Sequence, residues 1–398
     1  MNFIKKKHTD LSFNDKKMRI NSRKGRGPES ILYKSTWPLI CVIRILGLAP
    51  YEFKGEELVP SNKYMIFSFL WLIVFTYTFF WAIVSQMANM YRDDMRLPTA
   101  ITELCKFILN YVVVVIDIIM ALCTSKKLTN IWNRIQNYDE VIQNLGYGRN
   151  EKKTFAWVLA LLFFNLCIWT LISVFGMIGF SEPWLKNVTY MLIYIGSAAT
   201  VTKFAGITML LAQRFSQLNS IVQTTVVFAP RWKTIGSTIN YQLIGYLHDD
   251  LMVITENLNS IFFWSVLLWL TNLSTHSISS SFYALSWLLD QGSFTPSVYF
   301  SPIYCLSSWI TSFAFQIFML CYACHHASYE ANSMSAMMLE KRKWFYTYNR
   351  KMDVETLFHL ANRPLQFSAA GFFYVDLQLF TTIMSVMTTY LCILLQID

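Results

Sequence analysis

The stretch FAWVLALLFFNLCIWTLISVFGMIGF, residues 155–180, decides the fold class because its 26 residues include no charged side chain. A helix of about 20 apolar residues crosses the roughly 30 Å hydrocarbon core of a bilayer. The rest of the chain has a similar character, since 54% of all residues are hydrophobic and only 14% are charged. Soluble domains carry about 25% charged residues. The composition therefore predicts an all-α polytopic membrane protein.

Seven stretches are long and apolar enough to cross a membrane, and we predict seven transmembrane helices. These stretches are Tyr64–Val84, Leu104–Cys123, Phe155–Phe180, Val188–Ala212, Ser260–Tyr283, Ser301–Ala323 and Phe372–Gln396. A further apolar segment, Trp37–Pro50, is too short to cross. We interpret it as an interfacial or re-entrant helix that leads into the first span.

The distribution of Lys and Arg predicts the orientation of the chain, because cytoplasmic loops are enriched in these residues. Twenty-eight of them lie in the first 63 residues or in the connections after spans 2, 4 and 6, and three lie in the other connections. The N-terminus is therefore predicted to be cytoplasmic and the C-terminus extracellular. The sequon at Asn187 falls in a predicted outside loop and is a candidate for glycosylation. This orientation is opposite to that of a G-protein-coupled receptor, so no G protein is expected as a partner.

The long cytoplasmic connections carry amphipathic patterns, which predict a helical extension of spans 4–7 beyond the membrane. In one of them, Met352–Leu360, Asp353 is placed as a helix N-cap. The predicted organisation is a cytoplasmic region at 1–63, spans 1–6 at 64–327 with a helical linker at 213–259, an anchor region at 328–371 and a last helix at 372–398.

The residues give little support to other functional classes. The net charge of +9 comes from basic residues dispersed among hydrophobic spans, so nucleic acid is not an expected partner. Cys321, Cys324 and His325 match a haem-attachment spacing, but at the wrong end of span 6, and no second pair of zinc ligands is nearby. No catalytic set is evident. We therefore predict no enzyme, metal or cofactor. Asp117 and Lys203 are charged residues within spans, and a pair between them would be structural.

The last span has a mildly polar face. Stepping back from Gln396 by three or four residues reaches Ile393, Thr389, Val386 and Thr382, which share one side of a helix. Such a stripe can line a water path. The alternative is that Thr and Gln hydrogen-bond to a neighbouring helix, and periodicity alone does not choose between them.

The end of the chain resembles a known family. TYLCILLQ, residues 389–396, resembles the insect gustatory receptor signature of Thr-Tyr, five hydrophobic residues and Gln. FSAAGFFYVDLQLF (residues 367–380) and ILGLAP (residues 45–50) are similar to segments of the same family. Two departures are visible. Ile397 stands where Phe usually follows the Gln, and Leu391 stands where sugar receptors typically have an acidic residue.

The resemblance implies a gustatory receptor of the plasma membrane of sensory neurons. Members of this family are ligand-gated, non-selective cation channels built as homotetramers or heterotetramers in the lipid bilayer, and a small tastant, a sugar or a bitter compound, opens them. Gln396 and Ile397 would lie at the narrow outer pore, with Ile393, Thr389 and Val386 below them. Tyr390 would brace the helix.

Two further expectations concern the outer half of the protein. Asp398 and the terminal carboxylate would place a ring of negative charge at the outer mouth of a tetramer and attract cations. The candidate ligand-binding residues are aromatic, amide and imidazole side chains in spans 5 and 6. They are Trp269, Asn272, His276, Trp309 and Gln316. A secondary transporter and an odorant-receptor-type channel subunit remain alternatives.

Overall fold

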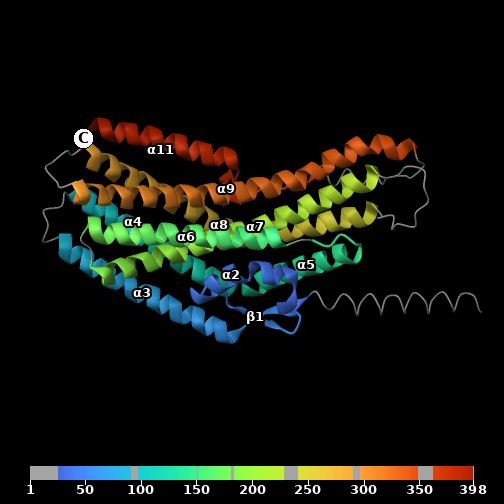
Figure 1. Cartoon of the computed structure of the whole chain (residues 1–398), viewed down its shortest axis with the longest axis horizontal. Helices are drawn as coiled ribbons and strands as arrows, with labels where there is room; N and C mark the ends of the chain where they lie inside the picture. Colours follow the sequence, from blue (N-terminus) through green and yellow to red (C-terminus); the bar gives the residue numbers. More distant parts are fainter. Residues whose placement is uncertain are drawn as a thin grey trace, which may run out of the picture.

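The computed structural model describes residues 26–90, 97–149, 151–180, 183–227, 241–289, 296–347 and 362–397. The described part is almost entirely helical (Figure 1). Its helices are η2 (Gly27–Glu29), α2 (Ile31–Ile45), α3 (Asn62–Met90), α4 (Leu97–Cys123), α5 (Ser125–Asn144), α6 (Lys152–Gly179), α7 (Trp184–Val227), α8 (Tyr241–Leu289), α9 (Pro296–Thr347) and α11 (Leu377–Ile397). Two small antiparallel hairpins pair β1 (Tyr51–Lys54) with β2 (Glu57–Pro60) and β3 (Ser368–Ala369) with β4 (Phe373–Tyr374).

Six helices of the described part are long and apolar enough to cross a membrane. They are α3, α4, α6, α7, α8 and α9. Helix α11 has 21 residues, and at 1.5 Å per residue it is about 31 Å long, which is enough for a seventh span. The prediction of a seven-helix membrane protein is therefore confirmed.

Helices α7, α8 and α9 are much longer than a bilayer is thick. They contain 44, 49 and 52 residues, so α9 alone extends over about 78 Å. Figure 1 shows the three helices projecting together beyond the other spans at one end. The predicted helical extension of these spans therefore forms by continuation of the membrane helices. The amphipathic segment Met352–Leu360 lies outside the described residues.

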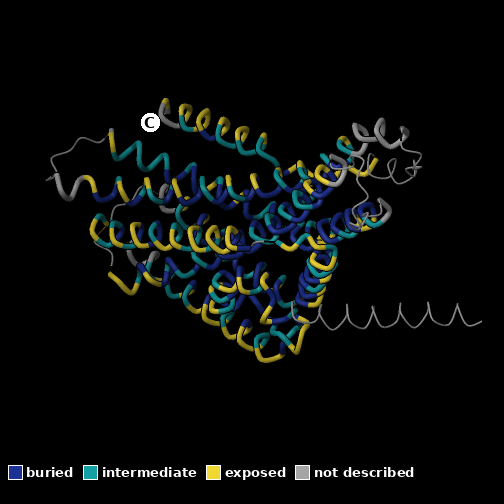
Figure 2. Tube along the Cα trace, turned by 45° about the vertical axis from the view of Figure 1, so that its right-hand side comes forward, coloured by how far each residue is buried: buried dark blue, intermediate teal, exposed yellow. Residues whose placement is uncertain are grey.

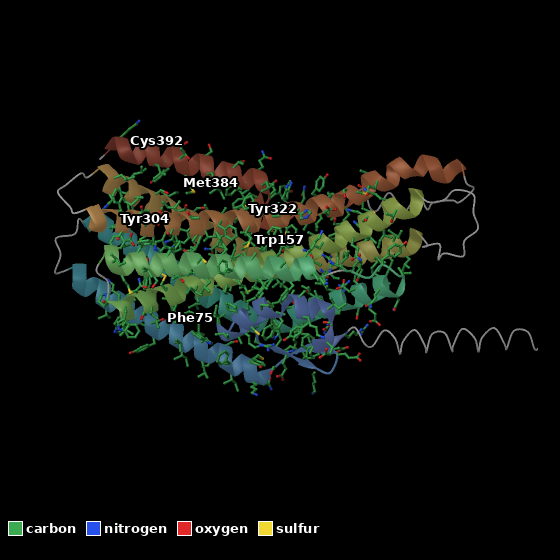
Figure 3. The ribbon with its side chains drawn as sticks, in the orientation of Figure 1. Phe75, Trp157, Tyr304, Tyr322, Met384 and Cys392 are labelled. Atoms are coloured by element: carbon green, nitrogen blue, oxygen red, sulfur yellow. The ribbon has the colours of Figure 1, made fainter. Side chains whose placement is uncertain are left out.

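The exposed residues of the bundle differ from those of a soluble protein. Helix α6 exposes Trp157, which is labelled in Figure 3. It also exposes Phe163 and Leu166, and all three side chains are suited to contact with lipid. Figure 2 shows buried residues concentrated along the central helices. Phe75 of α3 is fully buried, and its ring lies 3.1 Å from the position that a Cβ would take on Gly196 of α7. A small residue at this point lets the two helices approach closely.

Helix α2 begins earlier than the sequence indicates. Ser30 caps it, because the Ser30 hydroxyl accepts a hydrogen bond of 3.1 Å from the backbone N–H of Tyr33. The helix packs against α6 and α7. The chain after it is tied to the bundle interior, since Lys203 of α7 donates a 2.9 Å hydrogen bond to the Leu48 carbonyl. The segment after α2 is therefore anchored in the bundle, while Trp37 and Ile45 of the helix itself are exposed.

Helix α11 begins at Leu377, five residues later than the predicted last span. Hydropathy assigned residues 372–376 to the helix, but they follow a tight turn. Ala370 and Gly371 have φ angles of 51° and 77°, and the Phe372 N–H donates to the Ala369 carbonyl at 3.0 Å. Two positive φ angles are typical of the hairpin turn that pairs β3 with β4. The Asp376 carboxylate then accepts from the Leu379 N–H at 2.8 Å and caps the helix.

A buried arginine joins three segments at the end of the bundle where α5 packs. The Arg214 side chain of α7 has no exposed surface, and it forms ion pairs with Asp139 at 2.8 Å and Glu151 at 3.1 Å. The Tyr138 hydroxyl donates to the Arg214 carbonyl at 3.2 Å. Burial raises the pKa of Tyr138, which keeps this hydroxyl protonated as a donor. The cation therefore connects α5, the start of α6 and α7.

We predict that Arg214→Met lowers the thermal unfolding midpoint of the detergent-purified protein by more than about 5 °C. Removing one partner from a buried ion pair leaves carboxylates uncompensated, at a cost of roughly 3–5 kcal/mol. Arg363→Met is the matched control, because Arg363 also pairs with two carboxylates, Asp249 and Glu256, but 47% of its side chain is exposed. Exposed pairs contribute about 0–1 kcal/mol, so equal shifts for the two variants would contradict the assignment.

Candidate functional site

Polar residues line the contact between α4 and α8, deep within the bundle. Lys106, Asn110 and Asp117 on α4 are all buried. Asn110 faces Asn272 of α8 and Asp117 faces Trp269 of α8. The α4 residue number rises while its α8 partner's number falls, so the two helices run antiparallel here. We call this contact, from Lys106 to Asp117, the polar seam.

At the inner end of the seam, Asp117 accepts several hydrogen bonds. The Thr200 hydroxyl of α7 donates to its carboxylate at 2.6 Å, and the Trp269 indole N–H donates at 2.9 Å. Lys203 lies nearby on α7, but its amine donates to the Leu48 carbonyl. Asp117 and Lys203 therefore have separate hydrogen-bond partners. The ion pair between them that the sequence suggested is not formed as a direct contact.

In the middle of the seam, two amides pair side by side. The Asn272 Nδ2 group donates to the Asn110 Oδ1 atom at 3.0 Å. The Asn110 Nδ2 and Asn272 Oδ1 atoms have no hydrogen-bond partner among the described residues. Both side chains are almost completely buried. The pair thus presents one donor and one acceptor in an interior where unpartnered polar groups are costly.

One helical turn outward, an aromatic cluster surrounds His276. The Tyr194 ring centroid lies 4.7 Å from that of Tyr190, 5.1 Å from that of His276 and 4.6 Å from that of Trp309. Phe313 stacks on both His276 and Trp309, at 5.3 Å and 5.2 Å. The Tyr194 hydroxyl lies 3.0 Å from the Tyr190 hydroxyl and 3.4 Å from the His276 Nδ1 atom. We call these five residues the aromatic cluster.

An ion pair lies at the outer end of the seam. Lys106 pairs with Glu103, one turn earlier on α4, at 2.5 Å. The Lys106 amine also lies 5.2 Å from the centre of the Tyr283 ring of α8, within the range of a cation–π contact. The outer end therefore carries charge, but the two formal charges balance.

The structure brings together three of the five predicted ligand-site residues. Asn272 belongs to the amide pair, and His276 and Trp309 belong to the aromatic cluster. Trp269 is buried and bonded to Asp117. Gln316 is buried, and its amide donates to Ser312 on its own helix at 3.2 Å.

The predicted glycosylation of Asn187 does not fit the fold and needs correction. Asn187 lies within the first turn of α7 and is only 1% exposed. Its side-chain oxygen accepts a 2.6 Å hydrogen bond from the Ser173 hydroxyl of α6. A glycan on this nitrogen would have no access to solvent, so we do not carry the prediction forward.

Sequence reasoning missed Asn110, Tyr190 and Tyr194. A signal for each was present, because Lys106 and Asn110 are four residues apart on one face of an apolar span, and Tyr190 and Tyr194 have the same spacing. What the sequence does not show is which helix each stripe meets.

Helix α11 presents its polar stripe away from the bundle. It lies along the bundle and packs against α8 and α9 (Figure 1). Its Met387 side chain is buried. The predicted pore-lining residues whose side chains are described are all exposed: Val386, Thr389, Ile393 and Gln396. The Thr389 hydroxyl donates to the Ser385 carbonyl of its own helix at 3.1 Å. Thr389 therefore bonds within its own helix. It does not form the alternative contact, a hydrogen bond to a neighbouring helix of the same chain.

Three further residues at the end of the chain were assigned roles from the sequence: Tyr390, Ile397 and Asp398. The Ile397 side chain and the whole of Asp398 lie outside the described residues. Tyr390 is 50% exposed, so its ring is not enclosed by its own chain. Figure 3 shows Cys392 and Met384 on the same helix, with Tyr304 and Tyr322 on the neighbouring α9.

A separate polar cavity of about 190 Å³ lies near the start of α2, the second half of α5, residues 147–149 and Glu151. Its four carboxylates already have cationic partners. These pairs are Glu29 with Lys34, Asp139 with Arg214, Glu140 with Arg26, and Glu151 with Arg149 and Arg214. The cavity is therefore electrostatically balanced, and it lies away from the aromatic cluster.

The sequence and the fold of this chain are similar to those of known proteins. The family model described as 7tm Chemosensory receptor matches residues 38–398. The chain belongs to this family. The receptor is 26% identical over 226 residues to Gustatory receptor 68a of Drosophila melanogaster, a match that covers 55% of the receptor and 56% of that relative. The match thus spans little more than half the length of the curated relative.

Solved structures support the fold of the receptor. It is similar to the insect olfactory receptor OR5 from Machilis hrabei, with a TM-score of 0.62, 14% sequence identity, and coverage of 92% of the receptor and 99% of OR5. The structure of OR5 in complex with eugenol gives a TM-score of 0.60 at 15% identity, with the same coverage. At this level of identity, the similarity shows a shared fold.

We predict that Trp269→Phe destabilises the receptor, because it keeps most of the ring but removes the indole donor to Asp117. A lost hydrogen bond to a charged group costs about 1.5–3 kcal/mol, which a lowered thermal unfolding midpoint would report. Trp264→Phe on the same helix is the control, because Trp264 is 59% exposed. A midpoint for Trp269→Phe no lower than that for Trp264→Phe would show that the Asp117 contact contributes little.

Proposed function

We propose that this receptor is a subunit of a tetrameric, ligand-gated, non-selective cation channel of sensory neurons, with α11 of each subunit lining the pore and a small tastant as the ligand. The proposal assigns two sites to the chain. The aromatic cluster and amide pair form the ligand site, and the stripe of α11 forms the pore wall. Gln396 lies toward the outer mouth, with Ile393 and Thr389 further in.

The observation that carries the proposal is the exposed polar stripe of α11. Gln396 and Thr389 would face hydrocarbon if the chain were alone in a bilayer, and burying an amide in an apolar medium without a partner is costly. Copies of this helix around a shared axis place the stripe in water instead. Ile393 and Val386 on the same face are 48% and 59% exposed and offer an apolar constriction, which can close a pore by dewetting.

The taste assignment is supported by the partial match to a gustatory receptor. A small-molecule ligand is supported by the aromatic cluster, since ligand sites combine apolar walls with a few placed polar groups. Lys106 and Glu103 mark the outward end of the seam, where a ligand would arrive from outside the cell.

We predict that single cysteines at Thr389, Ile393 and Gln396, introduced in a Cys392→Ser background, make the ligand-evoked current sensitive to membrane-impermeant thiol reagents. A charged adduct in a water-filled pore obstructs the passage of cations. The measurement is whole-cell current before and after reagent, with the receptor expressed in cells that lack related receptors.

Met387→Cys is the matched control, because Met387 lies on the same helix but is only 4% exposed. Its current is expected to be unaffected. Insensitivity at all three stripe positions in a conducting receptor would remove α11 from the pore wall. Saturable, concentrative uptake of solute without current would favour a secondary transporter.

A further inference from the structure

We infer that the site takes an uncharged ligand with one aromatic ring and one hydroxyl group, in preference to sugars and protonated amines. This inference rests on the proposed function, because it specifies the ligand class of the same site. It depends on the polar seam, and above all on the pairing of Asn110 with Asn272.

The amide pair defines the polar part of the ligand. Asn110 Nδ2 offers a hydrogen-bond donor and Asn272 Oδ1 an acceptor, and neither has a partner among the described residues. An unpartnered buried polar group costs about 1–3 kcal/mol. A single hydroxyl can accept from the first and donate to the second, since it has both a proton and lone pairs. One ligand group therefore satisfies both amides.

This conclusion does not depend on how the two amides are oriented. The oxygen and nitrogen of an Asn side chain are assigned from the hydrogen-bond network. If both amides rotate by half a turn, Asn110 becomes the donor to Asn272. The pair then still presents one free carbonyl and one free NH₂ group. The recognised chemistry is the same in both arrangements.

The aromatic cluster defines the apolar part of the ligand. Asn272 and His276 are four residues apart on α8, so Asn272 of the amide pair lies about 6 Å along the helix from His276 of the cluster. Tyr194, Trp309 and Phe313 offer ring faces and edges at mutual centroid distances of 4.6 Å and 5.2 Å. Rings at these distances are in contact with one another, so a ligand ring would stack or pack edge-on against them by displacing neighbouring side chains. A short linker between ring and hydroxyl spans the distance.

Sugars fit this surface poorly. A hexose carries several hydroxyl groups, and each one buried without a partner costs about 1–3 kcal/mol. The hydroxyls of Tyr190 and Tyr194 lie within 3.0 Å of each other and already interact. Among the described residues of the amide pair and the cluster, the polar atoms without a partner are Asn110 Nδ2, Asn272 Oδ1 and His276 Nε2. These are too few to replace the water that the several hydroxyls of a hexose would lose.

Protonated amines fit it poorly as well. A buried ammonium ion needs a carboxylate that can pair with it. The two carboxylates of the seam are engaged, Glu103 with Lys106 and Asp117 with Thr200 and Trp269. At the outer end, the Lys106 ammonium already occupies the Glu103 carboxylate at 2.5 Å. An added cation would therefore find no available carboxylate among the described residues of the seam.

The test compares four probes on the full-length receptor in lipid nanodiscs. The probes are 2-phenylethanol, its protonated amine analogue 2-phenylethylamine, propylbenzene, which lacks a polar group, and fructose. Binding is measured as a concentration-dependent rise in the thermal unfolding midpoint, which needs no channel activity. We expect 2-phenylethanol to raise the midpoint at concentrations at least tenfold lower than any other probe.

The same measurement on variants connects the preference to the amide pair. Asn110→Leu and Asn272→Leu should each weaken binding of 2-phenylethanol about tenfold or more, which corresponds to about 1.4 kcal/mol, and leave propylbenzene unchanged. Asn165→Leu is the control, because Asn165 is an amide on α6 whose Nδ2 group donates to Leu161 of its own helix at 2.9 Å. It should bind all four probes like the wild type.

The outcomes separate this inference from the proposed function. Stabilisation by fructose or 2-phenylethylamine at lower concentrations than by 2-phenylethanol, or by none of the four probes, would overturn the ligand class. An equal response to 2-phenylethanol and propylbenzene would overturn the role of the amides. Because the wild-type series decides the class, it holds even if a variant fails to fold. Binding of 2-phenylethanol without any evoked current would leave the ligand class intact and reject the channel.

Discussion

The buried carboxylate of Asp117 is the constraint on which the arrangement of the membrane helices depends. A carboxylate taken from water into a bundle costs several kcal/mol unless hydrogen bonds compensate. Thr200 and Trp269 provide them, and each is available only if α7 and α8 lie in one register against α4. Because α4 and α8 are antiparallel and stiff, the contact of Asp117 with Trp269 also sets Asn110 against Asn272. The register of the proposed ligand site thus follows from Asp117, which lies outside it.

Much of the fold could be predicted from hydropathy, because lipid exposure demands continuous apolar helices and cytoplasmic loops are basic. The same signal was misleading where apolar residues do not form helix. Phe372 and Phe373 read as part of the last span, but the turn at Ala370 and Gly371 folds them into a hairpin. The Ala370 N–H donates to the Phe263 carbonyl of α8 at 3.1 Å. Such a contact joins segments distant in sequence, and periodicity does not reveal it.

The candidate site was predictable only in part, for a related reason. Asn272, His276 and Trp309 stand out within their own spans as polar or large aromatic residues. Asn110 does not become significant until its partner is known, and Tyr194 looks like any interfacial tyrosine until α8 and α9 pack against it. Gln316 has the same chemistry as the chosen residues but bonds within its own helix. Residue type suggests the chemistry, and packing decides which residues meet.

Helix α9 joins the two sites of the proposed channel. Trp309 and Phe313 lie on the face that meets the aromatic cluster, while the Phe318 ring contacts Phe380 of α11 at 5.5 Å. Phe313 and Phe318 are five residues apart, which corresponds to about 140° around a helix, so α9 lies between the cluster and α11. A ligand ring that enters beside Trp309 displaces atoms in a closely packed interior, which transmits strain because it has few voids. The proposed pore helix, α11, packs against this same α9. Ligand binding can therefore be linked to the pore through α9 alone.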